Sequence, residues 1–224
     1  MADRYDRFLQ TLASFEGTAD LTNPWSFARR SAPNRIRRAN LRRYLTRFEE
    51  TGSTVMFVGE ALGHRGGRLS GVPFTSLSLL LEGDHDLLGK SVGYRDPGDG
   101  GKIRREASAT MIWSAIERLP QPPLLWNAVP FHPHRPGDPR TNRRPRAAEL
   151  ELGMSYLRHL AALFDIERFV AVGRAASLVL ARLEIEHTYV RHPSVGGKSL
   201  FDRGIAELIE PVELDRDTGT RRSS

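Results

Sequence analysis

The chain has 224 residues, of which 39% are hydrophobic, enough for the core of one α/β domain. It contains no cysteine, which excludes disulfide bonds, thiolate zinc sites and cysteine-held iron–sulfur clusters. With 33 Lys and Arg against 27 Asp and Glu the net charge is +6, and most of the cations are arginines, which suit contacts with a polyanion. No apolar run approaches membrane-spanning length and the N-terminus lacks a signal-peptide pattern, so we expect a cytoplasmic protein of a prokaryotic cytoplasm or nucleoid, with no membrane attachment.

The N-terminal part of the chain predicts two helices. Apolar residues recur at helical spacing over residues 3–15, turn-forming residues follow over 17–24, and a second helix is predicted over 32–51. Six arginines crowd the polar side of this second helix: Arg35, Arg37, Arg38, Arg42, Arg43 and Arg47. We interpret them as the solvated face of a packing helix rather than as a surface that contacts DNA.

The first strand of the core is predicted over residues 54–58. Four apolar β-forming residues in a row indicate a strand buried on both faces, as in a parallel sheet. The apolar run stops at Gly59, and Glu60 follows directly. In α/β sheets ligands bind just beyond the carboxyl ends of the strands, which is the position of Glu60. Glu60 is therefore a candidate catalytic carboxylate, and an ordinary strand exit with a solvated Glu60 is the alternative. The glycines that follow allow a ligand to approach closely, and Phe74 adds an aromatic ring.

Helices and strands alternate through the rest of the chain. Helices are predicted over residues 77–81, 107–119, 147–164, 174–183 and 198–209, and strands over 124–130, 169–173 and 187–190. The alternation predicts an α/β fold, a three-layer α/β/α sandwich with a central, mostly parallel four-stranded sheet, plus N-terminal helices. We expect one domain over residues 1–214, with residues 1–52 as its N-terminal helical part, and a disordered tail over 215–224.

Polar side chains follow three of the four predicted strands. Glu60 follows the first, Asn127 lies near the end of the second, and His192-Pro193-Ser194 follow the fourth. Because parallel strands place their carboxyl ends at one edge, a carboxylate, an amide and an imidazole are expected to converge on one crevice. An asparagine sits poorly in a core strand, so Asn127 needs a hydrogen-bond partner, either a ligand or the backbone.

At these motifs the chain resembles the uracil-DNA glycosylase superfamily, over residues 53–205. The residues that carry the resemblance, in order, are Gly59-Glu60-Ala61-Leu62-Gly63, Gly71-Val72-Pro73-Phe74, Trp126-Asn127-Ala128-Val129-Pro130 and His192-Pro193-Ser194. They look most like the thermostable families 4 and 5. Leu62 stands where those families usually have proline, and family 5 usually lacks a carboxylate at the Glu60 position, so the chain combines features of the two. Both families hold an iron–sulfur cluster with four cysteines; this chain has none, so we expect no cluster and no other cofactor.

The resemblance implies a monofunctional DNA glycosylase that flips uracil out of DNA and hydrolyses its N-glycosidic bond, as in base excision repair. Glu60 would stabilise the sugar cation or activate water, and a neutral His192 would stabilise the leaving base. Asn127 would pair with N3–H and O4 of uracil while Phe74 stacks on the ring. The other substrate-binding positions that the resemblance implies are Gly59, Ala61 and Ser194.

Contacts with the DNA backbone are the least specific part of the prediction. The candidates are His64, Arg65, Lys102, Arg104, Arg105, Arg191 and Lys198, and for each residue taken alone an ordinary surface position is the favoured alternative. The residues that could wedge into the gap left by the base are Val195, Leu200 and Phe201. The resemblance also implies a side chain just after Gly63 that blocks a 5-methyl group, where this chain offers His64 and Arg65. No metal site is expected, because His132 and His134 have no Asp or Glu nearby at ligand spacing.

Three alternatives stay open. The protein could be a broader glycosylase that also removes hypoxanthine or xanthine, or a binder of uracil-containing or damaged DNA without turnover. Covalent capture by such a binder would need a histidine in the loop before the helix at 107, and residues 102–107 contain none. A small-molecule α/β enzyme with an incidental basic surface is the third. The expected partner is DNA containing uracil or deaminated bases, bound by a monomer.

Overall fold

The computed structural model describes residues 4–27, 31–101, 105–194 and 196–208. The predicted four-stranded sheet is confirmed, and all its strands are parallel in the order β5-β2-β7-β8. The strands are β2 (Val55–Ala61), β5 (Leu124–Val129), β7 (Arg168–Val172) and β8 (Thr188–Val190). The chain begins the sheet at β2, adds β5 on one side and then crosses to β7 and β8 on the other. The direction of winding therefore changes between β2 and β7, the kind of point at which α/β sheets bind ligands.

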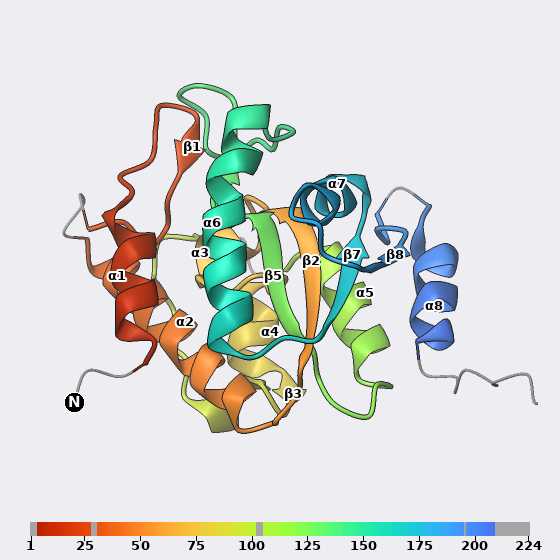
Figure 1. Cartoon of the computed structure of the whole chain (residues 1–224). Helices are drawn as coiled ribbons and strands as arrows, with labels where there is room; N and C mark the ends of the chain where they lie inside the picture. The colour runs from red at the N-terminus through yellow and green to blue at the C-terminus, as the bar shows by residue number, and fades with distance from the viewer. Residues whose placement is uncertain (1–3, 28–30, 102–104, 195, 209–224) are drawn as a thin grey trace, which may run out of the picture.

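Helices cover both faces of this sheet and confirm the three-layer α/β/α arrangement. In Figure 1, α6 (Ala147–Leu163) and α7 (Arg174–Arg182) lie in front of the sheet, α1 (Asp6–Ser14) lies beside α6, and α5 (Ala107–Ile116) lies behind. The helix α8 (Lys198–Glu207) packs beside the edge strand β8. Two further helices are α2 (Ala32–Glu49) and α4 (Leu77–Glu82). The carboxyl ends of the strands face the top of this view.

Several short elements were not expected from the sequence. The strand β1 (Leu21–Thr22) pairs antiparallel with β6 (His132–Pro133), and β3 (Asp84–His85) pairs antiparallel with β4 (Leu88–Gly89). A short helix, α3 (Gly67–Ser70), and a 3-10 turn, η1 (Lys90–Val92), interrupt the loops. Elements of two to four residues are too short to show a hydrophobic period, which is why the sequence did not reveal them.

The N-terminal segment belongs to the same core as the sheet. Trp25, which is 0% exposed, stacks on Trp126 of β5 with ring centroids 6.3 Å apart and donates its indole N–H to the carbonyl oxygen of Gly71 at 3.1 Å. The Tyr44 hydroxyl of α2 accepts a hydrogen bond of 2.8 Å from the backbone N–H of Leu125. This contact satisfies a donor at the edge of the sheet, where unpaired backbone groups are a liability.

Arg37 corrects the interpretation of the arginines of α2 as a solvated face. It is 3% exposed, its Nε donates to the carbonyl oxygen of Leu69 at 3.0 Å, and its guanidinium pairs with Asp99. A buried charge needs such partners. Because they lie far from Arg37 along the chain, the sequence alone could not predict these contacts. Gly71 allows the approach, because a Cβ atom there would lie 2.7 Å from the Cα atom of Arg37.

Phe201 is not the wedge residue suggested from the sequence. It is 0% exposed and belongs to the core beneath α8, so it cannot enter DNA without unfolding that helix. Leu200 is exposed, whereas Val195 lies outside the described residues, as does the tail over 215–224. Within the part of the chain that the structure describes, no helix combines the length and apolar character needed to cross a membrane.

Candidate functional site

A pocket of about 700 Å³ lies at the carboxyl edge of the sheet, where the direction of winding changes. Its walls come from the ends of β2, β5 and β7, from the loop after β2, from the start of α5, and from the segments that precede α6 and follow β8. The structure thus brings together the separately predicted groups Glu60, Phe74, Asn127, His192 and Ser194, which all line this pocket. Gly59 and Ala61 line it as well.

Asn127 forms the buried end of the pocket, opposite Gly59 in the register of β5 and β2. A Cβ atom at position 59 would overlap the Phe74 ring and lie 2.8 Å from Oδ1 of Asn127, so only glycine lets the ring and the amide meet here. The Asn127 side chain is 3% exposed, yet among the described residues no hydrogen bond to its amide is found. Buried amides normally have partners, so this one presents unused donors and an acceptor to the pocket.

Phe74 holds its ring in place through an unusual backbone conformation. Its φ angle is +56°, in the left-handed region that non-glycine residues rarely adopt. The indole N–H of Trp113 in α5 donates to the Phe74 carbonyl oxygen at 3.0 Å and fixes this conformation. Strained backbone of this kind persists where the surroundings over-determine it, and it is common at ligand sites.

Glu60 lies at the end of β2 beside open space. The strand pairs with β7 only as far as Val58, so beyond that point β2 has β5 as its one neighbour in the sheet. Partial burial raises the pKa of the Glu60 carboxyl above its ordinary value, and the charge of Arg144 acts in the opposite direction. The Glu60 carboxylate therefore faces the pocket near the charge of Arg144, and it has no hydrogen-bond partner among the described residues.

The tautomer of His192 follows from its neighbours. The backbone N–H of Ser194 donates to Nδ1 of His192 at 3.2 Å, and the Ser194 hydroxyl lies 2.8 Å from the same nitrogen. Because Nδ1 accepts, the proton of the neutral ring is on Nε2. Burial, with the charge of Arg191, lowers the pKa of His192, so the ring is neutral near pH 7 and offers an N–H donor.

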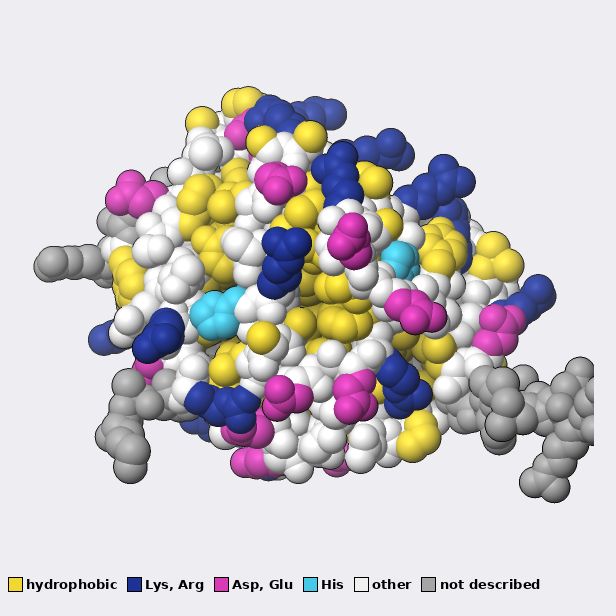
Figure 2. Space-filling model, viewed as in Figure 1, with side chains coloured by type: hydrophobic (Ala, Val, Ile, Leu, Met, Phe, Trp, Pro, Cys, Tyr) yellow, Lys and Arg dark blue, Asp and Glu magenta, His cyan; other side chains and the backbone are white. Residues whose placement is uncertain are grey.

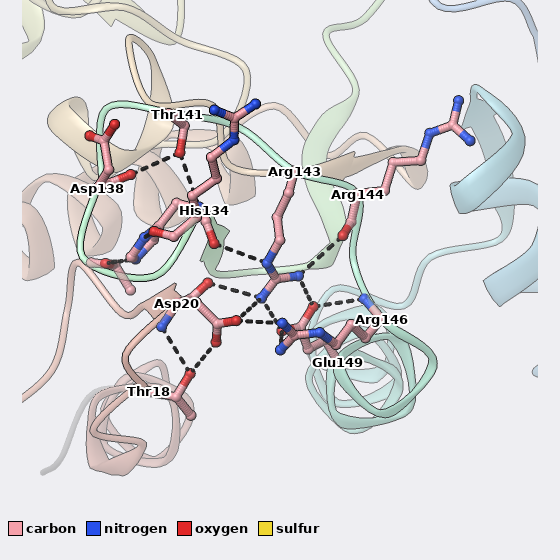
Figure 3. Close-up of polar contacts among 11 residues, drawn as sticks. Thr18, Asp20, His134, Asp138, Thr141, Arg143, Arg144, Arg146 and Glu149 are labelled. Carbon is pink, nitrogen blue, oxygen red and sulfur yellow. Dashed lines mark hydrogen bonds and ion pairs between the residues drawn. The ribbon is translucent and has the colours of Figure 1, made fainter.

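A cluster of ion pairs fixes the loop between β6 and α6 (Figure 3). Arg143 binds both carboxylate oxygens of Glu149, at 2.7 and 2.5 Å, and donates to the carbonyl oxygen of Asp20 at 2.9 Å. The Arg146 guanidinium pairs with the Asp20 carboxylate at 2.5 Å. We call these four residues the Arg143 clamp. The clamp joins the N-terminal segment, the loop and the start of α6. It also contacts Arg144, because the Arg143 guanidinium donates to the carbonyl oxygen of Arg144 at 3.1 Å.

Arg144 itself projects away from the clamp in Figure 3 and lines the pocket. It is one of several pocket residues that the sequence did not single out: Glu106, Asn142, Arg143, Arg144, Arg174 and Tyr189. In Figure 2, Lys and Arg side chains gather along the upper edge of the molecule, near the starts of α6 and α7. The arginine-rich run over residues 143–146 was the available signal, but nothing in it tells which side chain turns to the pocket.

The predicted DNA-backbone residues are dispersed. Arg191 lines the pocket, Arg105 is exposed, and Lys198 pairs with Asp202 on α8. His64 and Arg65 lie outside the pocket walls; the His64 backbone N–H donates to Oδ1 of Asn142 at 3.0 Å and ties two loops together. Lys102 and Arg104 lie outside the described residues.

The two neighbouring histidines do not form a metal site among the residues that the structure describes. The His132 and His134 rings stack with their centroids 5.3 Å apart. Nδ1 of His132 is hydrogen-bonded to the carbonyl oxygen of Leu62 at 2.8 Å, so this nitrogen holds the loop. Over the described ranges no three His, Cys, Asp or Glu residues form a group that could hold a metal ion. The iron–sulfur cluster of families 4 and 5 has no cysteine ligands in this chain.

Comparisons with known proteins agree with the fold. Wild-type SMUG2 of Pedobacter heparinus has a similar structure, with a TM-score of 0.60 and 16% sequence identity over 93% of this chain and 97% of that chain. A search of curated protein sequences found no match. The family model of the uracil DNA glycosylase superfamily matches residues 46–217, which include all four motifs and the whole parallel sheet. The protein therefore belongs to the uracil DNA glycosylase superfamily.

Proposed function

We propose that the protein hydrolyses the N-glycosidic bond of uracil in DNA. The observation that carries this proposal is the Asn127 amide, which lines the pocket, has no hydrogen-bond partner among the described residues and lies beside the Phe74 ring across Gly59. Its oxygen can accept from N3–H of uracil while its NH₂ group donates to O4. Cytosine presents the opposite pattern and would leave buried groups unpaired, which costs about 1–3 kcal/mol for each neutral group.

Glu60 and His192 act on the two charges that develop as the bond breaks. The electron pair of the bond between C1′ and N1 leaves with the base, so the sugar becomes cationic and the base anionic. The Glu60 carboxylate stabilises the cation and orients the water that adds to C1′, and the water proton passes to the carboxylate or to solvent. His192 donates its Nε2–H to O2 of the leaving base. Loss of such a donor typically costs about 10²–10³-fold in rate.

The surroundings of the pocket suit an extruded nucleotide. Arg144, Arg174 and Arg191 line the pocket wall and supply cations for the phosphates of the strand, and Ser194 supplies a hydroxyl. The base has to leave the duplex to reach Asn127, because that residue lies at the buried end of the pocket. Phe74, already held by Trp113, receives the base by stacking.

The test uses labelled oligonucleotides that carry uracil, hypoxanthine, xanthine or a G·T mismatch, single- and double-stranded. Each is incubated with the protein and then treated with hot alkali, which cleaves abasic sites. We expect cleavage at uracil, lost in Glu60→Gln, Asn127→Ala and His192→Ala and kept in Arg158→Gln, an exposed position on α6. Cleavage that survives in all three pocket variants would rule out this site.

A broader activity on deaminated purines is the second candidate. A volume of about 700 Å³ lies within the range of pockets that enclose drug-sized ligands, so a purine has room here. Cleavage at hypoxanthine or xanthine in the same assay would support it. Retarded bands on a native gel without cleavage at any base would instead indicate a binder without turnover.

A further inference from the structure

A second carboxyl group, that of Glu106, lines the same pocket as Glu60. Glu106 is the N-cap residue of α5, but its side chain makes no capping hydrogen bond with that helix. It turns instead onto the loop after β2, where a Cβ atom at Gly63 or Gly66 would overlap the Glu106 carboxyl group. Two glycines thus leave the space that this carboxyl group occupies, and it lines the same pocket as Asn127.

The surroundings of Glu106 favour the neutral acid. Burial raises its pKa to about 7, and the charge of Arg65 is the opposing influence. Within the described residues, Glu106 has neither an ion pair nor a side-chain hydrogen bond that would compensate its charge. The other charged or titratable groups that line the pocket are Glu60, Arg143, Arg144, Arg174, Tyr189, Arg191 and His192. A carboxyl group that keeps its proton is a hydrogen-bond donor as well as an acceptor.

This inference rests on the proposed function and concerns how the base is read. Deamination replaces an exocyclic amino group, which donates, by a carbonyl oxygen, which accepts. We propose that Glu106 is a base-reading residue whose carboxyl group donates a hydrogen bond to the carbonyl oxygen that deamination creates. That oxygen has two lone pairs and can accept two hydrogen bonds. In this proposal the Asn127 amide binds it from the N3 side of uracil, and Glu106 binds it from the C5 side. In a deaminated purine the same donor reaches O6 or N7.

The consequence is a preference that depends on one proton. With the proton present, the O–H group of Glu106 donates to the carbonyl oxygen, whereas an amino group in its place cannot accept that hydrogen bond. Without the proton, the carboxylate repels the carbonyl oxygen. Excision of deaminated bases is therefore expected to fall as the pH rises above about 7, the opposite of what an ionised Glu60 requires.

The experiment measures kcat/KM for uracil and hypoxanthine excision between pH 5.5 and 9 at constant ionic strength. For the wild type we expect a fall of about tenfold per pH unit on the alkaline side. Glu106→Gln carries an amide N–H donor at every pH, so it should keep activity near pH 6.5 within a few fold and lose the alkaline fall. The matched control Glu151→Gln, at an exposed position of α6, should keep the wild-type profile.

The outcomes separate this inference from the proposed function. An alkaline fall that Glu106→Gln shares with the wild type, or no fall in the wild type, overturns the role of Glu106 alone. No excision of any base by the wild type overturns the proposed function and this role with it. A measurement without a variant is proton uptake when the wild type binds DNA carrying cleavage-resistant 2′-fluoro-deoxyuridine at pH 8, followed by calorimetry in two buffers. Uptake of up to one proton supports the role, and no uptake refutes it.

Discussion

Gly59 and Asn127 lie opposite each other in the parallel register of β2 and β5, and the Phe74 ring and the Asn127 amide fill the space that a side chain at Gly59 would need. The glycine is thus part of the pocket wall although it has no functional group.

Gly59→Ala is expected to displace the ring and the amide while the sheet persists. Misplacement of reacting groups by about 1 Å can cost 10²-fold in rate, so single-turnover uracil excision should fall by about that factor. Circular dichroism should still report the native helix content. Full activity in a folded Gly59→Ala protein would contradict the close packing described above.

Asn127→Asp is expected to change which base the pocket accepts. The carboxyl group lacks the NH₂ donor that we propose for O4 of uracil, and in its protonated form it can donate to N3 of cytosine and accept from the cytosine amino group. The ratio of uracil to cytosine excision should fall by at least about tenfold, measured on oligonucleotides that differ in one base. An unchanged ratio would mean that another residue discriminates between these bases.

The acid side of the pH profile is expected to report Glu60. Partial desolvation raises its pKa, so the carboxylate is lost at a higher pH than for a fully solvated glutamate, and excision should fall as the pH drops through that value. Burial and the charge of Arg191 lower the pKa of His192, so its ring gains a proton at a lower pH than an ordinary imidazole does. Glu60→Gln, assayed from pH 4.5 to 7, should be slow throughout and should lack the acid fall. The same acid fall in that variant would assign it to another group.

Glu149→Gln is expected to weaken the Arg143 clamp and the fold together. Removing one charge of a buried pair typically costs about 3–5 kcal/mol, which lowers Tm by roughly 10 °C in a chain of this size. Burial acts to raise the pKa of Glu149, but the hydrogen bonds from Arg143 and Arg146 lower it on balance. This stabilisation is complete above the unfolded-state pKa and disappears as the pH falls through the folded-state value. The Tm difference from the wild type should therefore shrink in acid, with Glu151→Gln as the neutral control.

Arg144→Gln is expected to weaken DNA binding in a salt-dependent way. If Arg144 contacts a phosphate, its loss should reduce the slope of log K against log salt by about one, whatever the sequence. The variant should also move the acid fall of excision to higher pH, because Arg144 acts to lower the pKa of Glu60. Arg158→Gln should change neither quantity. An unchanged slope would show that the guanidinium does not contact the DNA backbone.

The sequence was sufficient for the architecture because each core strand carries its own signal. Residues 55–58 and 124–126 are continuous apolar runs, and polar groups follow at the strand ends, so a parallel sheet with one converging edge could be predicted. The short pairing of β1 with β6 could not, because its register depends on contacts between residues far apart in the chain.

Pocket residues could be predicted from the sequence only where they lie at or just after the end of a strand. Glu60, Asn127 and His192 directly follow or end strands, whereas Glu106 precedes a helix and resembles an ordinary first-turn acid. Only the folded loop shows that Gly63 and Gly66 leave room for its carboxyl group. Arg37 was misinterpreted for the same reason, since its partners Leu69 and Asp99 lie far along the chain.

The stacking of Trp25 on Trp126 affects where this chain can be divided. The family model begins at residue 46, yet the core of β5 is completed by Trp25 and Tyr44, and the loop beside the pocket is held by Asp20. A fragment that starts at residue 46 would expose the indole face of Trp126 and free Arg143 from one of its partners. The family match and the packed core thus have different boundaries, because the core that supports the pocket also includes residues before position 46.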